Sequence, residues 1–145
     1  MMTIMDAARY FIYLSYNQKI RSLTPLKLQK LLYLAQGWSC VWDGVYLFPE
    51  EFVAWKYGPV NESIYDEFKK YKSDEIPERE GIEGRDLDKS DKETLEAVWE
   101  EYSDLSAYAL VDLTHKQLPW QLAYGKGTNE LIAKEVISHY FRETY

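Results

Sequence analysis

The sequence predicts a mainly α-helical fold: a single compact bundle of about six helices with a short extended or hairpin arm around residues 46–57. Apolar residues recur at helical spacing in most segments. They make up 46% of the 145 residues, and a chain of this size buries roughly two-thirds of its unfolded surface, which is enough for a core. No internal repeat or Gly/Ser-rich linker divides the chain, so we expect one domain.

The second predicted helix carries the clearest start signal. Thr24 is a candidate N-cap, Pro25 suits the first helical turn, and apolar periodicity follows at once. Gly44 is the expected end. Apolar residues cover nearly every side of this helix, so we expect it to lie at the centre of the bundle. The first helix is expected at residues 3–18.

Four further helices follow from the same periodicity. Ser90 and Glu93 predict a capping box at the start of the fourth helix. In the arm, Tyr57-Gly58-Pro59 predicts a turn, and Pro119-Trp120 is expected to interrupt the chain before the last helix. We expect these four helices to begin near Val60, Ser90, Ser106 and Asn129.

Residues 73–89 form the longest predicted loop. Nine acids and four bases fall within residues 74–93, and Pro77, Gly81 and Gly84 interrupt any helical pattern. Loops of this length are usually mobile or functional. We therefore expect a mobile acidic loop, which is either a solvated segment or a docking surface for a basic partner.

Composition narrows the classes of function. The net charge of −7 argues against general binding of phosphate backbones, although the basic first 40 residues leave a local nucleic-acid patch open. No stretch approaches the roughly 20 apolar residues of a membrane span, so no membrane partner is expected. A single cysteine and the lack of an export signal predict a cytoplasmic protein.

The sequence contains no credible catalytic or metal-binding motif, so we predict no enzyme activity, no metal and no cofactor. Cys40 lies in a helix without a cationic neighbour, which favours a buried, inert thiol. His115 and His139 do not belong to a zinc-binding spacing. Asp112 and His115 are three positions apart and can form a hydrogen bond, which leaves a hydrolase centred on this pair as the enzymatic alternative.

A polar stripe flanks the apolar residues of the second helix. Gln29, Tyr33 and Gln36 stand at positions i, i+4 and i+7. They form either a boundary face bonded to neighbouring elements or an exposed recognition stripe.

Three segments resemble the motifs of the Panacea domain, also called the SocA-like antitoxin or GepA-like phage-associated domain. Residues 23–38, LTPLKLQKLLYLAQGW, resemble its first motif, and residues 54–60, AWKYGPV, its second. Leu113-Thr114-His115 with Pro119-Trp120 resembles the third. The motifs occur in the family order and span most of the chain, which implies one Panacea domain over residues 1–145.

The resemblance implies an antitoxin of a bacterial or prophage toxin–antitoxin system, which neutralises a cognate toxin by direct protein binding. The alternatives are a proteolytic adaptor that delivers the toxin to the ClpXP protease and a phage-associated regulatory protein. Trp55 is expected either to anchor the partner or to pack on the second helix. The candidate partner-binding residues are Lys27, Gln29, Lys30, Tyr33, Gln36, Trp55, Tyr57, His115 and Trp120.

Overall fold

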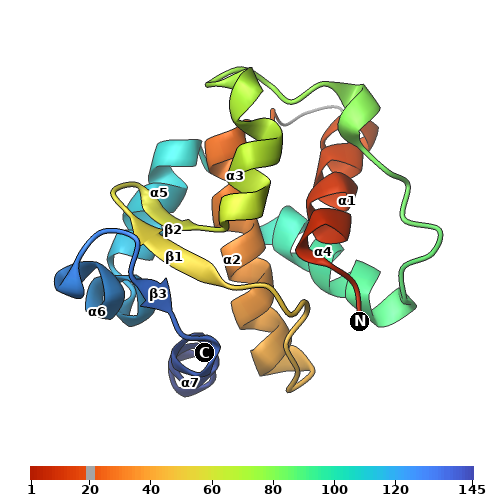
Figure 1. Ribbon diagram of the computed structural model, residues 1–145. Helices are drawn as coiled ribbons and strands as arrows, with labels where there is room; N and C mark the ends of the chain where they lie inside the picture. The colour runs from red at the N-terminus through yellow and green to blue at the C-terminus, as the bar shows by residue number, and fades with distance from the viewer. Residues whose placement is uncertain (19–21) are drawn as a thin grey trace.

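The computed structural model describes residues 1–18 and 22–145, and within these ranges the chain is mainly helical with a small antiparallel sheet (Figure 1). This confirms the predicted fold class. The helices are α1 (Ile4–Asn17), α2 (Pro25–Trp42), α3 (Glu62–Phe68), α4 (Lys89–Tyr102), α5 (Ala107–His115), α6 (Leu118–Lys126) and α7 (Lys134–Thr144). The strands are β1 (Phe52–Trp55), β2 (Gly58–Val60) and β3 (Leu131–Ile132), and short 3-10 helices lie at Lys69–Tyr71 and Glu78–Glu80.

Helix α2 is the centre of the fold, as predicted. It packs against α1, α3, α4, α5, α7 and β2 (Figure 1). Its N-terminus is capped by the Thr24 side chain, which accepts a hydrogen bond from the Lys27 backbone N–H. Gly44 adopts a φ of +69° just beyond the helix, a conformation that glycine reaches without a Cβ clash.

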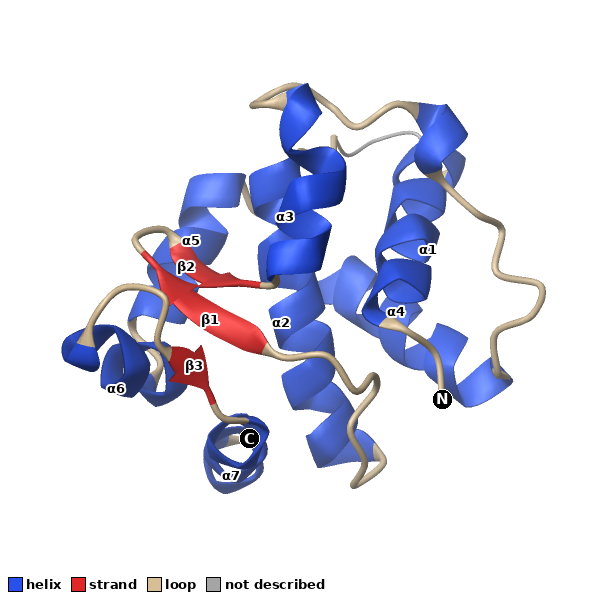
Figure 2. Cartoon of the chain, in the orientation of Figure 1, coloured by secondary structure: helices blue, strands red, loops and turns tan. Residues whose placement is uncertain are grey.

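The arm is a β-hairpin in a sheet of strand order β2-β1-β3 (Figure 2). Trp55 pairs with Gly58, so the two turn residues are Lys56 and Tyr57. The predicted turn at Tyr57-Gly58-Pro59 is therefore placed too late, because Gly58 and Pro59 already belong to β2. Strand β2 is an edge strand, where a proline without an N–H is tolerated.

Three predicted element boundaries are wrong, each for a local reason. Helix α4 begins at Lys89, so Ser90 lies inside its first turn and forms no capping box. Pro119 does not interrupt the chain; it lies in the first turn of α6, where its missing N–H leaves no helical bond unmade. The last helix begins at Lys134, because Leu131–Ile132 pair with β1 instead.

The segment between α3 and α4 packs along α1 (green in Figure 1). Ile76 is buried, and its backbone N–H donates to the Leu23 carbonyl over 2.9 Å. The Ile82 N–H donates to the Arg9 carbonyl over 3.0 Å, and the Tyr16 hydroxyl donates to the Ile76 carbonyl over 2.6 Å. Ile76 is therefore a core residue inside the predicted solvated loop, whereas Glu78, Arg79 and Ile82 are exposed, and the predicted mobility of the segment stays a prediction.

An ion-pair network fixes this segment to α1. The Arg9 guanidinium donates to the carboxylates of Glu80, at 2.8 Å, and Glu67, at 3.0 Å. The Tyr71 hydroxyl also donates to Glu80. The Tyr71 hydrogen bond and, next, that of Arg9 lower the pKa of Glu80 below its ordinary value of 4.5, because both favour the carboxylate form.

Glu80→Gln removes this charge while keeping the shape of the side chain. Because the folded-state pKa of Glu80 is lowered, its contribution to stability is present above pH 4.5 and is lost as the pH falls through the folded-state value. We expect the variant to melt a few degrees below the wild type near neutral pH and to lose less stability on acidification. Thermal melts from about pH 7 to about pH 3 measure both effects.

Glu93→Gln is the matched control, because Glu93 is exposed and its only carboxylate contact among the described residues is a 3.9 Å ion pair with Lys89. It should follow the wild type at every pH. Acid profiles of the same slope for wild type and Glu80→Gln would contradict the network.

Candidate functional site

Two buried glutamines of α2 hold the backbone of the arm. The Gln29 side chain donates to the Asn61 carbonyl over 3.0 Å and accepts from the Asn61 N–H over 2.9 Å. Gln36, two helical turns further along α2, makes the same pair of bonds. Its side chain donates to the Phe48 carbonyl over 2.9 Å and accepts from the Leu47 N–H over 2.7 Å. Each side-chain amide thus satisfies one backbone carbonyl and one backbone N–H next to the hairpin.

The polar stripe of α2 is consequently a boundary face. Gln29, Tyr33 and Gln36 are all buried, so the interpretation as an exposed recognition stripe is wrong. Tyr33 packs edge-on against Phe52 and Phe141. Burial raises the pKa of Tyr33 well above its ordinary value, and its hydroxyl has no hydrogen-bond partner within the part of the chain that the structure describes.

Lys30 is a buried cation beneath the hairpin. Its side chain is fully buried, and its Nζ donates to the Pro59 carbonyl over 2.9 Å. Burial lowers the pKa of Lys30 from 10.5 to about 7, because the charged ammonium loses its hydration. Lys27, one turn earlier, is also buried and donates to the Ser103 carbonyl.

Gly58 lets the hairpin approach α2 and α5 this closely. Its φ is +108°, and a Cβ there would lie 2.7 Å from Lys30 Cε and 2.8 Å from Thr114 Oγ1. Any side chain would push β2 off the lysine. The glycine of the second motif is thus required by a lysine of the first and a threonine of the third.

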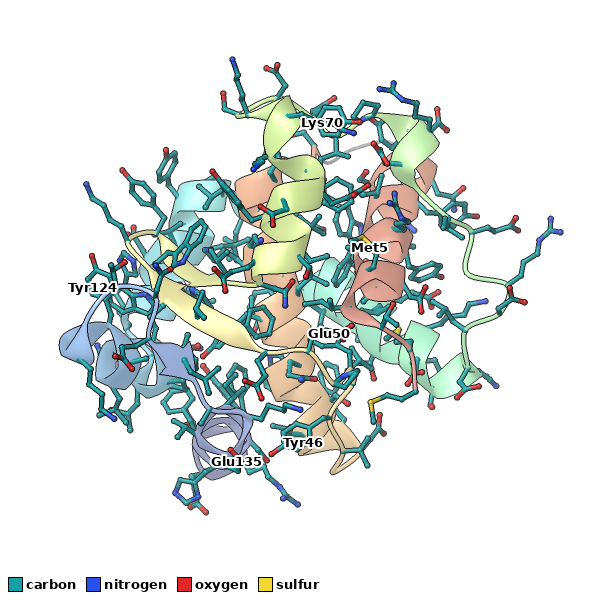
Figure 3. All side chains as sticks on the ribbon, viewed as in Figure 1. Met5, Tyr46, Glu50, Lys70, Tyr124 and Glu135 are labelled. Atoms are coloured by element: carbon teal, nitrogen blue, oxygen red, sulfur yellow. The ribbon has the colours of Figure 1, made fainter. Side chains whose placement is uncertain are left out.

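Two aromatic rings of the third motif fix the turn. His115 Nε2 lies 2.9 Å from the Lys56 carbonyl, and Trp120 Nε1 donates to the Trp55 carbonyl over 2.8 Å. A carbonyl only accepts, so His115 Nε2 carries the proton. The His115 and Trp120 rings stack at 4.0 Å, and Trp120 stacks on Tyr124, which Figure 3 labels at the left edge of the molecule.

On its other face the hairpin borders an open groove of about 390 Å³ between β1, the turn and α3. Trp55, Tyr57 and Tyr65 form its aromatic walls, with Tyr57 46% and Tyr65 42% exposed. The Trp55 ring meets Tyr65 edge-on at 4.8 Å, and its Nε1 donates to the Asn129 side chain. The apolar floor consists of Pro25, Leu26, Val60 and Ile64.

Three lysines stand around the groove: Lys56, Lys69 and Lys72. The Lys56 ammonium lies 5.5 Å from the centre of the Tyr57 ring, and that of Lys69 lies 5.7 Å from Tyr65. Lys72 has a φ of 53° and a ψ of −118°, a backbone conformation that residues with a Cβ rarely adopt. Such strain is stored preferentially at functional sites.

The candidate residues from the sequence therefore separate into three groups. Trp55 and Tyr57 stand in the groove wall, whereas His115 and Trp120 lie behind the hairpin and position its turn. The five candidates on α2 are buried, and of these Gln29 borders the groove: Lys27, Gln29, Lys30, Tyr33 and Gln36.

Sequence reasoning missed the α3 side of the groove. Tyr65 and Lys69 are four positions apart and share one helical face, a spacing that was available in the sequence. Pro25 and Leu26 were interpreted only as a helix start. No sequence pattern predicts that Lys72 borders the groove, because its placement depends on the backbone conformation after α3.

The remaining candidate chemistry has structural explanations. Cys40 is buried, as predicted, and burial raises the pKa of its thiol. His115 bonds to a backbone carbonyl rather than to Asp112. Of the five bases near the N-terminus, Lys27 and Lys30 are buried, Arg9 is ion-paired, and Lys19 and Arg21 lie outside the described residues.

Lys30→Met tests the buried cation. Between about pH 7 and pH 10.5 the unfolded chain binds a proton on Lys30 that the folded protein releases, so the contribution of Lys30 to stability rises with pH across this window. The methionine variant should lack that rise. Urea unfolding at about pH 6, 8 and 10 gives the slope, which is the readout because methionine also leaves the Pro59 carbonyl without its donor.

Lys89→Met, at an exposed site, should keep the wild-type slope. Parallel profiles for wild type and Lys30→Met would show that Lys30 does not titrate in this range.

Comparison with known proteins agrees with the motifs. The family model "Antitoxin SocA-like, Panacea domain" matches residues 28–121. Antitoxin SocA of Caulobacter vibrioides (strain NA1000 / CB15N) is 34% identical over 119 residues, which cover 74% of this chain and 63% of that protein. No solved structure matches. Among the described residues, none of the helices combines the length and apolarity needed to cross a membrane. The chain belongs to the SocA-like Panacea domain family.

Proposed function

We propose that this protein is an antitoxin that neutralises a toxin protein by binding it directly, without catalysing a reaction. One observation carries the proposal: the three family motifs converge on a single hairpin and hold it at the edge of an exposed aromatic groove. Membership in an antitoxin family supports the same role.

The groove has the composition of a protein-binding surface. Tyrosine and tryptophan are enriched among the residues that supply most of the binding energy at interfaces. Trp55, Tyr57 and Tyr65 present their rings on one side of the molecule, and the bonds to His115, Trp120 and Gln29 fix the backbone that carries them. A surface that is already ordered loses little conformational entropy on binding.

The same contacts weaken the enzymatic alternative. The Nε2–H of His115 is used by the Lys56 carbonyl, and its ring is covered by Trp120. A hydrolase centred on Asp112 and His115 would need Asp112 to orient the imidazole, whereas here the Lys56 carbonyl and Trp120 do so. The histidine thus has a positioning role in the hairpin.

The test of this proposal is a growth assay with the reading frame next to this gene in its source genome. Induction of that frame alone should arrest growth, co-expression of this protein should restore growth, and the two proteins should co-purify. Sequestration also predicts that rescue persists in cells lacking ClpXP, whereas an adaptor mechanism requires the protease. Arrest that this protein does not relieve would count against the proposed function.

Trp55→Ala tests the groove as the binding surface. Trp55 is half-buried, so we expect a folded protein with a modestly lowered melting temperature. Loss of an aromatic anchor should weaken toxin binding by roughly 2 kcal/mol or more and abolish rescue. Calorimetric titration and thermal melts separate the two effects.

Trp42→Ala is the matched control. Trp42 is 47% exposed at the opposite end of α2, where it stacks on Trp38. This variant should bind and rescue as the wild type does. Rescue by Trp55→Ala at wild-type level, or loss of rescue only in Trp42→Ala, would move the binding surface elsewhere.

A further inference from the structure

The groove beside the hairpin combines an apolar interior with a cationic rim. Within the described ranges, the residues that line it include three lysines and no carboxylate. The charge of the groove is therefore positive, whereas the net charge of the whole chain is −7. An acidic protein that gathers lysines around one apolar groove presents a local site for negative charge.

The lysines differ in how far they are already neutralised. Lys69 lies 3.4 Å from Asp66, but both side chains are more than half exposed, so this ion pair is weak. For Lys56 and Lys72 the described residues provide no carboxylate within ion-pair distance. These two ammonium groups, one on the turn and one after α3, are the free charges of the rim.

Lys72 adds a second observation. Its backbone adopts a conformation suited to glycine, and glycine there would remove the strain at once. The chain instead carries a lysine whose side chain borders the groove. A lysine at this strained position is explained if the protein needs its ammonium group beside the groove.

We propose that the groove binds an acidic segment of a partner protein, with an apolar side chain of that segment inserted between Trp55, Tyr57 and Tyr65 and its flanking carboxylates paired with Lys56 and Lys72. This specifies the chemistry of the partner and rests on the proposed function for the partner being a toxin. Apolar anchor and charge are recognised by different parts of the same groove, so both are needed for binding.

The experiment uses the intact protein and does not require the toxin. Short random peptides displayed on phage are selected on the wild-type protein, and the enriched peptides are measured against groove variants. We expect sequences in which acids flank an aromatic or large aliphatic residue. Their affinity should fall about tenfold or more in Lys56→Glu/Lys72→Glu and fall with rising salt.

Two controls exclude trivial explanations. Arg85→Glu/Lys89→Glu makes the same change in net charge at two exposed sites away from the groove, just before α4 and at its first residue, and should bind the peptides as the wild type does. Lys72→Gly removes the ammonium and relieves the backbone, so it should melt no lower than Lys72→Ala while losing binding to the same extent. A binding loss in a glycine variant that is at least as stable cannot be caused by unfolding.

Three results would overturn the proposal: a basic or uncharged peptide consensus, enriched peptides that bind the Lys56→Glu/Lys72→Glu protein equally well, or no enrichment of groove-dependent peptides. Each is distinct from failure of the proposed function, because growth rescue by the wild-type protein is measured separately. Rescue that survives in Lys56→Glu/Lys72→Glu would leave an antitoxin whose toxin binds at another surface.

Discussion

The pairing of buried side-chain amides on α2 with the backbone of the arm is the interaction on which the rest of the structure depends. Leaving a buried amide or peptide group without a partner costs roughly 1–3 kcal/mol. Gln29 and Gln36 each satisfy both their own donor and acceptor and the peptide groups at Asn61 and at Leu47–Phe48. Neither the helix nor the arm can move away without losing both ends of two such pairs.

That pairing sets the position of everything around the groove. Asn61, held by Gln29, also caps α3 through its side chain, so the helix that carries Tyr65 and Lys69 starts at a fixed point. Its side-chain amide donates to the Glu51 carbonyl just before β1. From the opposite side, His115 and Trp120 hold two successive carbonyls of the hairpin. The side chains of the groove are thus carried by backbone that is hydrogen-bonded from both sides.

The central helix and its apolar face could be predicted because periodicity reports burial directly. The burial of Gln29, Lys30 and Gln36 could not be predicted, because the sequence does not show that each of these polar groups finds a backbone hydrogen-bond partner. The same limit applies to residues 129–132, where pairing with β1 overrides a helical pattern. It also applies to Ile76, an isolated apolar residue in a charged segment that nevertheless enters the core.

The motifs themselves illustrate why recognition of a family does not identify a binding site. Most motif residues stabilise the hairpin. Gly58 leaves room for the side chains of Lys30 and Thr114, and His115 and Trp120 of the third motif form hydrogen bonds with the backbone of the turn. Of the candidates drawn from the motifs, Trp55 and Tyr57 form walls of the groove, and Gln29 borders it with a side chain that is bonded to Asn61. The other walls come from α3 and the residue that follows its 3-10 extension.

The charge distribution then decides what kind of partner such a groove favours. A net charge of −7 repels acidic proteins at long range, and this repulsion is screened within about 10 Å at moderate salt. For an acidic partner, attraction replaces this repulsion only where its carboxylates reach Lys56 and Lys72 directly. Complementary charge of this kind contributes more to discrimination between partners than to affinity, and in the proposed complex the affinity comes from the aromatic walls. The fixed backbone beneath the hairpin makes that discrimination possible, because the lysines and the rings keep one spacing for the partner to match.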